Sequence, residues 1–139
     1  MKISIINGPN INLIGVREPE IYGSQTFEHY FEKMRHRYET IDFDYFQSNI
    51  EGELINEIQR AGMKMDGIIL NAGGYTHTSV AIGDAVAASK APVIEVHVSN
   101  INAREEFRMI NHISAKCKGT IIGLGLKGYA MAVEYFFQK

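Results

Sequence analysis

The stretch "DGIILNAGG", residues 66–74, decides the fold. It is a short, continuous apolar run that stops at Asn and Gly, which favour turns. An apolar run without alternation is typical of a strand buried on both faces, and such strands belong to parallel sheets covered by helices. We therefore expect further strands of this kind, each separated from the next by a helix.

The rest of the chain repeats this arrangement. Four more segments are rich in β-branched or aromatic residues and predict strands at residues 2–7, 42–48, 91–100 and 119–125. Five segments with helical patterning lie between and after them, at residues 26–39, 51–62, 78–89, 102–116 and 127–138. The alternation predicts an α/β fold: a three-layer sandwich with a flavodoxin-like, five-stranded parallel sheet and helices on both faces.

Capping residues set the expected helix ends. Thr26 is suited to cap the helix over 26–39, whose apolar positions follow a helical spacing. Gly62 is expected to end the helix over 51–62. Asn102 with Glu105 three residues later forms a capping-box pattern and predicts a helix over 102–116.

Composition limits the function classes. The 139 residues predict a single domain, 1–139, and a net charge of −2 gives no electrostatic case for nucleic acid. No apolar stretch reaches the roughly 18 residues of a membrane span, and the N-terminus lacks a signal-peptide pattern. The single cysteine, Cys117, excludes an internal disulfide and argues against a cysteine metal site. We expect a soluble cytoplasmic protein that binds neither nucleic acid nor membrane.

Polar side chains gather after the carboxyl ends of three predicted strands, where parallel sheets bind ligands. They are Asn10, Arg17, Tyr22, Asn71, His77, His97, Ser99, Arg104 and Arg108. Asn10, Arg17 and Tyr22 lie in a connector, residues 6–24, that is far longer than the usual 4–6 residues. Loops of that length are commonly functional, so the strand ends predict a binding or catalytic site.

Several of these residues have a plainer interpretation. Asn10 is a common turn residue, Tyr22 could bury its ring in the loop, and His77 could support the following helix. Arg104 and Arg108 could lie on a solvated face, paired with nearby glutamates. Glu95 and His97 are less ambiguous, because residues two apart share one face of a strand. A carboxylate there favours the imidazolium and orients the ring, which suits a general acid.

No phosphate-binding loop is evident. The first strand–helix connection does not fit G-x-G-x-x-G, and G-x-x-x-x-G-K-[ST] is absent from the sequence. Residues 123–128, "GLGLKG", match the first motif but follow the last strand, so no βαβ unit surrounds them. We expect no cofactor.

Five ordered motifs resemble type II 3-dehydroquinate dehydratase over residue 3 to about residue 135. They are "INGPNINLIGVREPEIYG" (6–23), "FQSNIEGELI" (46–55), "NAGGYTHTSVA" (71–81), "IEVHVSNINAREEFR" (94–108) and "GLGLKGY" (123–129). The resemblance implies a flavodoxin-like fold, no cofactor or metal, and conversion of 3-dehydroquinate to 3-dehydroshikimate and water. It implies a place in the shikimate pathway, which leads to chorismate and the aromatic amino acids; the same reaction also serves quinate breakdown.

The resemblance also implies roles for individual residues. Tyr22 would be the base, with Arg17 stabilising its phenolate. Asn10 would hold a water that stabilises an enolate intermediate. His97, supported by Glu95, would be the general acid for the departing hydroxyl.

A second group would bind the substrate or order the site. The resemblance implies that Asn71, His77, Val98 through its backbone, Ser99 and Arg108 contact the substrate, and that Arg104 helps to order the closed loop. Asp84 would reach into a neighbouring subunit's site, because the family assembles as trimers packed into a dodecamer.

The chemistry explains the long connector. Removing a proton next to a ketone and expelling a hydroxyl needs a base, an acid and support for the enolate. We expect residues of about 15–25 to form a lid that carries the base and excludes water on closing.

Three positions differ from the residues common in the family. Ile50 and Asn102 stand where histidines are common, and Gly83 replaces a longer residue, which puts the subunit contacts in doubt.

Three other interpretations of the sequence remain. One alternative is a flavodoxin-like flavin- or phosphate-binding module. The others are a receiver-type signalling domain and a purely structural oligomer.

Overall fold

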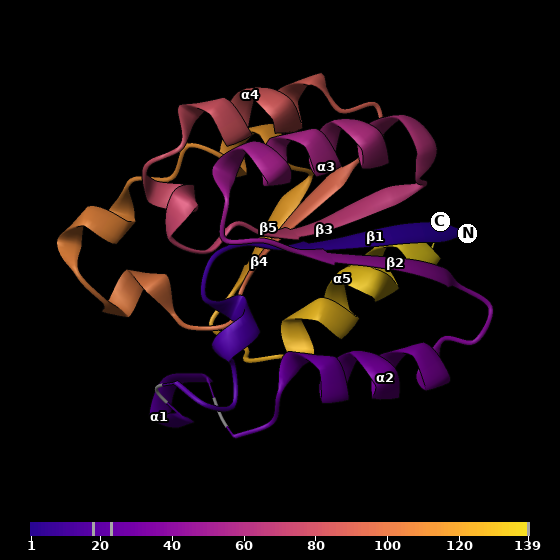
Figure 1. Ribbon diagram of the computed structural model, residues 1–139, viewed down its shortest axis with the longest axis horizontal. Coiled ribbons are helices and arrows are strands. Elements are labelled where there is room, and N and C mark those ends of the chain that lie inside the picture. Colours follow the sequence, from indigo (N-terminus) through magenta and orange to yellow (C-terminus); the bar gives the residue numbers. More distant parts are fainter. Residues whose placement is uncertain (18, 23, 139) are drawn as a thin grey trace.

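The computed structural model describes residues 1–17, 19–22 and 24–138, apart from the side chains of Ile21 and Tyr22. Its centre is a five-stranded, fully parallel sheet in the order β2-β1-β3-β4-β5 (Figure 1). The strands are β1 (Lys2–Asn7), β2 (Asp42–Gln47), β3 (Gly67–Asn71), β4 (Val93–His97) and β5 (Gly119–Ile122). This order is the flavodoxin-like one, so the predicted fold class is confirmed.

Helices cover both faces of the sheet. They are α2 (Phe27–Arg37), α3 (Glu51–Lys64), α4 (Val80–Ala88) and α5 (Lys127–Phe137), whereas the short helix α1 (Pro19–Tyr22) lies away from the sheet in the connector after β1. In Figure 1, α3 and α4 lie above the sheet, and α2 and α5 lie below it. The predicted N-cap of α2 is confirmed, because the Thr26 hydroxyl accepts a hydrogen bond from the His29 backbone N–H.

The alternation of side chains along each strand builds two separate cores. Ile3, Ile5 and Ile69 face α2 and α5, where they join Phe27 and Tyr129. The neighbouring strand positions, among them Ile6, Ile68 and Leu70, face the other way and pack with Leu54 and Ile58 of α3 and with α4. The central strands are therefore apolar on both faces, as their continuous apolar runs predicted.

The predicted helix over 102–116 is wrong. The segment forms three short 3₁₀ turns instead, at Ile101–Ala103, Glu106–Met109 and Ser114–Lys116. Asparagine side chains interrupt it: Asn100 accepts from the Asn102 N–H, and Asn111 accepts from the N–H groups of Ile113 and Ser114. These local bonds compete with a helical ladder and leave the backbone free for contacts with the rest of the fold.

Gly62 does not end α3, which continues to Lys64. It is a packing residue, because a Cβ atom there would lie 2.6 Å from the Ser89 Oγ. Gly83 in α4 has a similar reason, since its Cβ would lie 2.4 Å from the His112 carbonyl oxygen. Both glycines let neighbouring segments approach closely.

The long connector after β1 contains a 3₁₀ turn, Ile11–Leu13, and the short helix α1. Ile11 and Ile14 are buried and anchor its first half, whereas Leu13, Val16 and Arg17 are exposed. Its role as a lid stays a prediction. Within the described residues, no helix is long and apolar enough to cross a membrane.

Candidate active site

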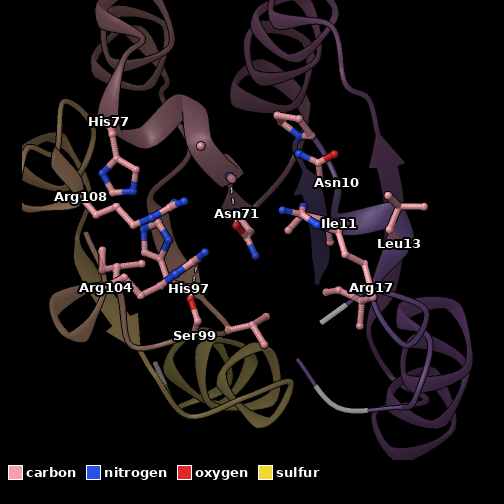
Figure 2. A pocket seen from close by; sticks show the side chains of 16 residues that line it. Asn10, Ile11, Leu13, Arg17, Asn71, His77, His97, Ser99, Arg104 and Arg108 are labelled. Atoms are coloured by element: carbon pink, nitrogen blue, oxygen red, sulfur yellow. Dashed lines mark hydrogen bonds between the residues drawn. The ribbon is translucent and has the colours of Figure 1, made fainter. Parts of the chain in front are cut away.

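A pocket opens at the carboxyl ends of β1, β3 and β4. Figure 2 shows Asn10, Ile11, Leu13 and Arg17 on one side of it, with Asn71 between the two sides. The opposite side carries His77, His97, Ser99, Arg104 and Arg108. The parallel sheet explains the convergence, because the carboxyl ends of its strands meet at one edge.

Glu95 and His97 form a buried pair at the end of β4. The His97 Nε2 lies 2.8 Å from the Glu95 Oε1. Glu95 is fully buried beneath His97, and His97 itself lines the pocket. The prediction that the two side chains share one strand face is confirmed.

Glu95 is held in its ionised form. Burial alone would raise its pKa, but hydrogen bonding and charge from His97, with further bonds from Asn111 and Thr120, hold the pKa below its ordinary value. Since an ionised carboxylate only accepts hydrogen bonds, the His97 Nε2 must carry a proton. The Nδ1 atom is then the ring nitrogen available for proton exchange with a ligand.

Asn71 is fixed from behind by Tyr129. The Asn71 Nδ2 donates to the Tyr129 hydroxyl at 2.9 Å, and that hydroxyl donates to the Asn7 Oδ1 at 2.8 Å. The Asn71 Oδ1 accepts from the Gly73 N–H at 3.1 Å. Asn7 and Asn71 are partners in the β1–β3 register, which brings both amides to the same level.

Asn10 sits in a turn stabilised by the segment after β2. It has a left-handed backbone with φ of 69°, which asparagine tolerates better than most residues. Its N–H donates to the Asn49 Oδ1 at 3.1 Å, and Gln47 donates to the same oxygen at 3.2 Å. The plain interpretation of Asn10 as a turn residue therefore holds, and Asn10 also lines the pocket.

The arginines concentrate positive charge at the pocket. Arg108 Nε lies 2.6 Å from the Glu105 Oε2, and Arg104 Nη1 donates to the Ser99 hydroxyl at 3.4 Å. Both side chains are only 18% exposed, so the surface pairing with Glu105 coexists with a place in the pocket wall. With Arg17, they favour an anionic ligand such as a carboxylate.

His77 stays neutral and is fixed by the backbone. Its Nδ1 lies 2.7 Å from the Ile110 carbonyl oxygen, to which it donates, leaving Nε2 free to contact a ligand. Burial lowers the pKa of His77, and the positive charge of Arg108 adds to this effect. Its ring lies 6.4 Å from that of His97. His77 therefore offers a neutral hydrogen-bonding group beside the proposed acid.

The "GLGLKG" segment supports the rim of β4. Gly123 and Gly125 have positive φ angles of 83° and 64°. Their N–H groups donate to the carbonyl oxygens of His97 and Val98. These glycines end β5 and fix the backbone at the pocket, so the motif has a role unrelated to phosphate binding.

The pocket brings together nine of the twelve predicted site residues: Asn10, Arg17, Asn71, His77, His97, Val98, Ser99, Arg104 and Arg108. Glu95 lies beneath His97. Asp84 is exposed on α4 and does not line this pocket. The Tyr22 side chain lies outside the described residues. Among the described residues, no group of three or more His, Cys, Asp or Glu side chains could hold a metal ion.

Sequence reasoning missed the residues behind the pocket. Thr76, Asn111 and Thr120 contact Glu95, and Tyr129 contacts Asn71. Only Thr120 left a usable signal: it pairs with Glu95 in the β4–β5 register, which an alignment of the two strand ends would suggest. The others reach the site from turns and from α5.

Comparison with known proteins agrees with this geometry. A family profile described as dehydroquinase class II matches residues 1–137. A 3-dehydroquinate dehydratase from Fusobacterium nucleatum is 50% identical over 99% of this chain and 97% of its own length. A 3-dehydroquinate dehydratase from Campylobacter jejuni subsp. doylei is 53% identical over 99% of this chain and 88% of its own length.

Solved structures show the same fold. The type II dehydroquinase of Butyrivibrio crossotus has a TM-score of 0.94 and 46% identity, and covers 99% of this chain and 97% of its own. That of Propionibacterium acnes has the same TM-score at 38% identity. Because the profile and the relatives span nearly the whole chain, this protein belongs to the class II dehydroquinase family.

Proposed function

We propose that this protein is a 3-dehydroquinate dehydratase, a hydro-lyase that converts 3-dehydroquinate to 3-dehydroshikimate and water. The observation that carries the proposal is the buried Glu95–His97 pair, which opens into a pocket rich in arginine. Relatives that align with almost the whole chain have this name. They give no support to the alternative of a flavin- or phosphate-binding module.

The proposed reaction begins with proton removal. Tyr22 takes a proton from the carbon next to the substrate ketone, and the electron pair moves to the oxygen as an enolate. An ordinary tyrosine, with a pKa of about 10, is only about 0.1% ionised at pH 7, so its phenolate needs a cation. Arg17, which lines the pocket on the same connector, supplies that charge. Asn10 holds a water against the enolate oxygen.

The second step expels the hydroxyl. As the enolate collapses, the bond to the hydroxyl on the next carbon breaks, and His97 donates a proton so that water leaves. Glu95 orients the ring and stabilises its charged form. Asn71, His77, Ser99 and the Val98 backbone bind the substrate's polar groups; Arg108 binds its carboxylate, and Arg104 helps to order the closed lid, residues of about 15–25.

Turnover is the test. Purified protein is mixed with 3-dehydroquinate in the presence of EDTA, and the conjugated product is followed by its ultraviolet absorbance. The proposal expects saturable turnover that EDTA does not reduce. A folded sample that leaves the substrate unchanged over a range of pH would contradict it.

Two variants test the assigned roles. Tyr22→Phe keeps the ring but removes the ionisable hydroxyl, so it should bind the substrate with little change in Kd and lose most of its turnover. His97→Ala should likewise fold and lose most of its turnover. Near-normal kcat in either variant would contradict that residue's role.

The assembly is also part of the proposal. Phe107, Met109 and Ile110 lie in one short segment and are each more than half exposed, which is unusual for such large apolar side chains. A second copy of the chain would cover them, and Asp84 on α4 would then reach a neighbouring site. We expect trimers packed into a dodecamer, measurable by sedimentation, and a cytoplasmic location, measurable by cell fractionation.

A further inference from the structure

Glu95 receives hydrogen bonds from four different parts of the fold. His97 on β4 donates to Oε1 at 2.8 Å, and Thr76 donates to the same oxygen at 3.4 Å. Thr120 on β5 donates to Oε2 at 3.2 Å. The Asn111 Nδ2 lies 3.3 Å from Oε1 and 3.1 Å from Oε2. Every oxygen of this fully buried carboxylate therefore faces donors.

The direction of the Asn111 bond is fixed by its own surroundings. Its Oδ1 accepts from the N–H groups of Ile113 and Ser114 at 2.8 and 2.9 Å. The amide nitrogen must then face Glu95, and an amide nitrogen only donates. Residues on either side of Asn111 make related contacts, because the Ile110 carbonyl accepts from His77 and the His112 N–H donates to the Thr76 carbonyl.

We propose that Asn111 and Thr120, with a weaker contribution from Thr76, are positioning residues that keep Glu95 ionised and fixed against the His97 ring. They do not touch the substrate in this account; they act through Glu95. The inference rests on the proposed function, in which His97 is the acid. This role also explains why the segment after β4 does not form a continuous helix, because its 3₁₀ turns place Asn111 and the Ile110 carbonyl at the site.

Several titratable groups lie around the pair. His77 and Arg108 lie close to it, and Arg17 and Arg104 line the same pocket as His97. Cys117 lies on the loop before β5. Burial raises the pKa of the Cys117 thiol to about 12, so it stays neutral. Burial also keeps His77 neutral. The donors on Glu95 therefore act on the carboxylate that contacts His97.

Thr120 offers a matched pair of variants. Thr120→Val keeps the shape and removes the hydroxyl, whereas Thr120→Ser keeps the hydroxyl. A hydrogen bond to a charged group is strong enough for its loss to lower kcat about 3- to 10-fold. We expect that loss in Thr120→Val with little change in KM, and near-normal kcat in Thr120→Ser. In a Glu95→Gln background, Thr120→Val should have no further effect.

Asn111→Asp tests the amide. It keeps an acceptor for the Ile113 and Ser114 N–H groups but replaces the donor by a second carboxylate oxygen. Because two adjacent carboxylates repel, we expect a larger loss of kcat, on the order of 100-fold. Thermal unfolding of each variant separates this effect from a loss of folded protein.

A measurement without substrate separates the two proposals. Nitrogen-15 NMR of histidine-labelled protein shows which His97 ring nitrogen carries the proton in the neutral ring. We expect that proton on Nε2 in the wild type and in Thr120→Ser, and shared between Nε2 and Nδ1 in Thr120→Val. If the wild type has no turnover, the proposed function fails while this spectrum still tests the positioning. If turnover is present but kcat and the spectrum are unchanged in Thr120→Val and Asn111→Asp, the positioning proposal is wrong.

Discussion

Tyr129 shows how a residue outside the pocket can shape it. The side chain is completely buried among Phe27, Tyr30 and other residues of the core between the sheet and helices α2 and α5. Burial raises the pKa of its phenol well above the ordinary value. It therefore stays neutral, donating one hydrogen bond to Asn7 and accepting one from Asn71. It is not suited to act as a base, but it sets the direction of the Asn71 amide.

Tyr129→Phe should keep the aromatic packing and release Asn71. Two buried amides would each lose a partner, so we expect the free energy of unfolding to fall by about 1–3 kcal/mol. We also expect KM to rise several-fold, with a smaller change in kcat, because Asn71 is assigned to substrate binding. Chemical denaturation and steady-state kinetics measure both. Tyr38→Phe is the control, since Tyr38 follows the C-terminal end of α2 and donates its hydrogen bond to Glu134 on α5. An equal rise in KM in Tyr38→Phe would contradict the account.

Glu95 makes a pH-dependent contribution to stability. Its pKa is lowered in the folded protein, so the folded state binds this proton more weakly than the unfolded chain does. Its stabilisation is then complete above the unfolded pKa of about 4.5 and is lost as the pH falls through the folded value. We expect stability below about pH 4.5 to fall more steeply in the wild type than in Glu95→Gln, by denaturation at several pH values. Parallel curves would contradict this.

The sequence predicts the site residues that have a local signal, but not those that contact the site from distant segments. Strand ends and the two-residue spacing were enough to find His97, Glu95 and the arginines, because those signals are local. Asn111 and Tyr129 contact the site across 16 and 58 residues of sequence. Such contacts depend on how turns and helices pack, which no local pattern contains.

The elements of the fold were predictable to different degrees. Strands with continuous apolar runs and helices with a clear apolar stripe were found, since burial decides both. The helix over 102–116 was not correct, although Asn102 and Glu105 match a capping box. In the structure, Asn100 and Asn111 bond the backbone locally, and tertiary contacts to Glu95 on β4 and to Thr76 and His77 in the turn after β3 replace the helix.

Helix α4 gives a prediction in which two effects oppose each other. Helix propensity alone favours alanine over Gly83 by about 1 kcal/mol. However, the new Cβ would meet the His112 carbonyl oxygen, a backbone atom that cannot easily move, and overpacking typically costs about 1–3 kcal/mol. We expect Gly83→Ala to lower the Tm. Gly52→Ala in α3 is the control, because nothing lies within 4 Å of its Cβ, and it should raise the Tm slightly. A stabilised Gly83→Ala would contradict the packing argument.

At the scale of the whole molecule, the proposed role of Asp84 in a neighbouring subunit's site can be tested. That side chain is exposed on α4 and does not line the pocket of its own chain. If it serves a neighbouring subunit, two inactive variants should complement each other. We expect Asp84→Ala and His97→Ala to be poorly active alone and to regain part of the activity when they are co-expressed and purified together.

The regained activity has a structural reason. In a mixed assembly, some sites combine a native His97 with a native Asp84 from the next chain. Wild-type protein at the same concentration gives the reference rate. A mixed assembly no more active than the average of its parents would place Asp84 outside the neighbouring site.

The most direct test of the central claim is a crystal structure of Tyr22→Phe soaked with 3-dehydroquinate, in which the substrate should remain intact. The account predicts the substrate carboxylate beside Arg108, the ring near Asn71, and the leaving hydroxyl within hydrogen-bond distance of the His97 Nδ1. A substrate bound elsewhere, or bound here with its hydroxyl turned away from His97, would contradict the proposed site.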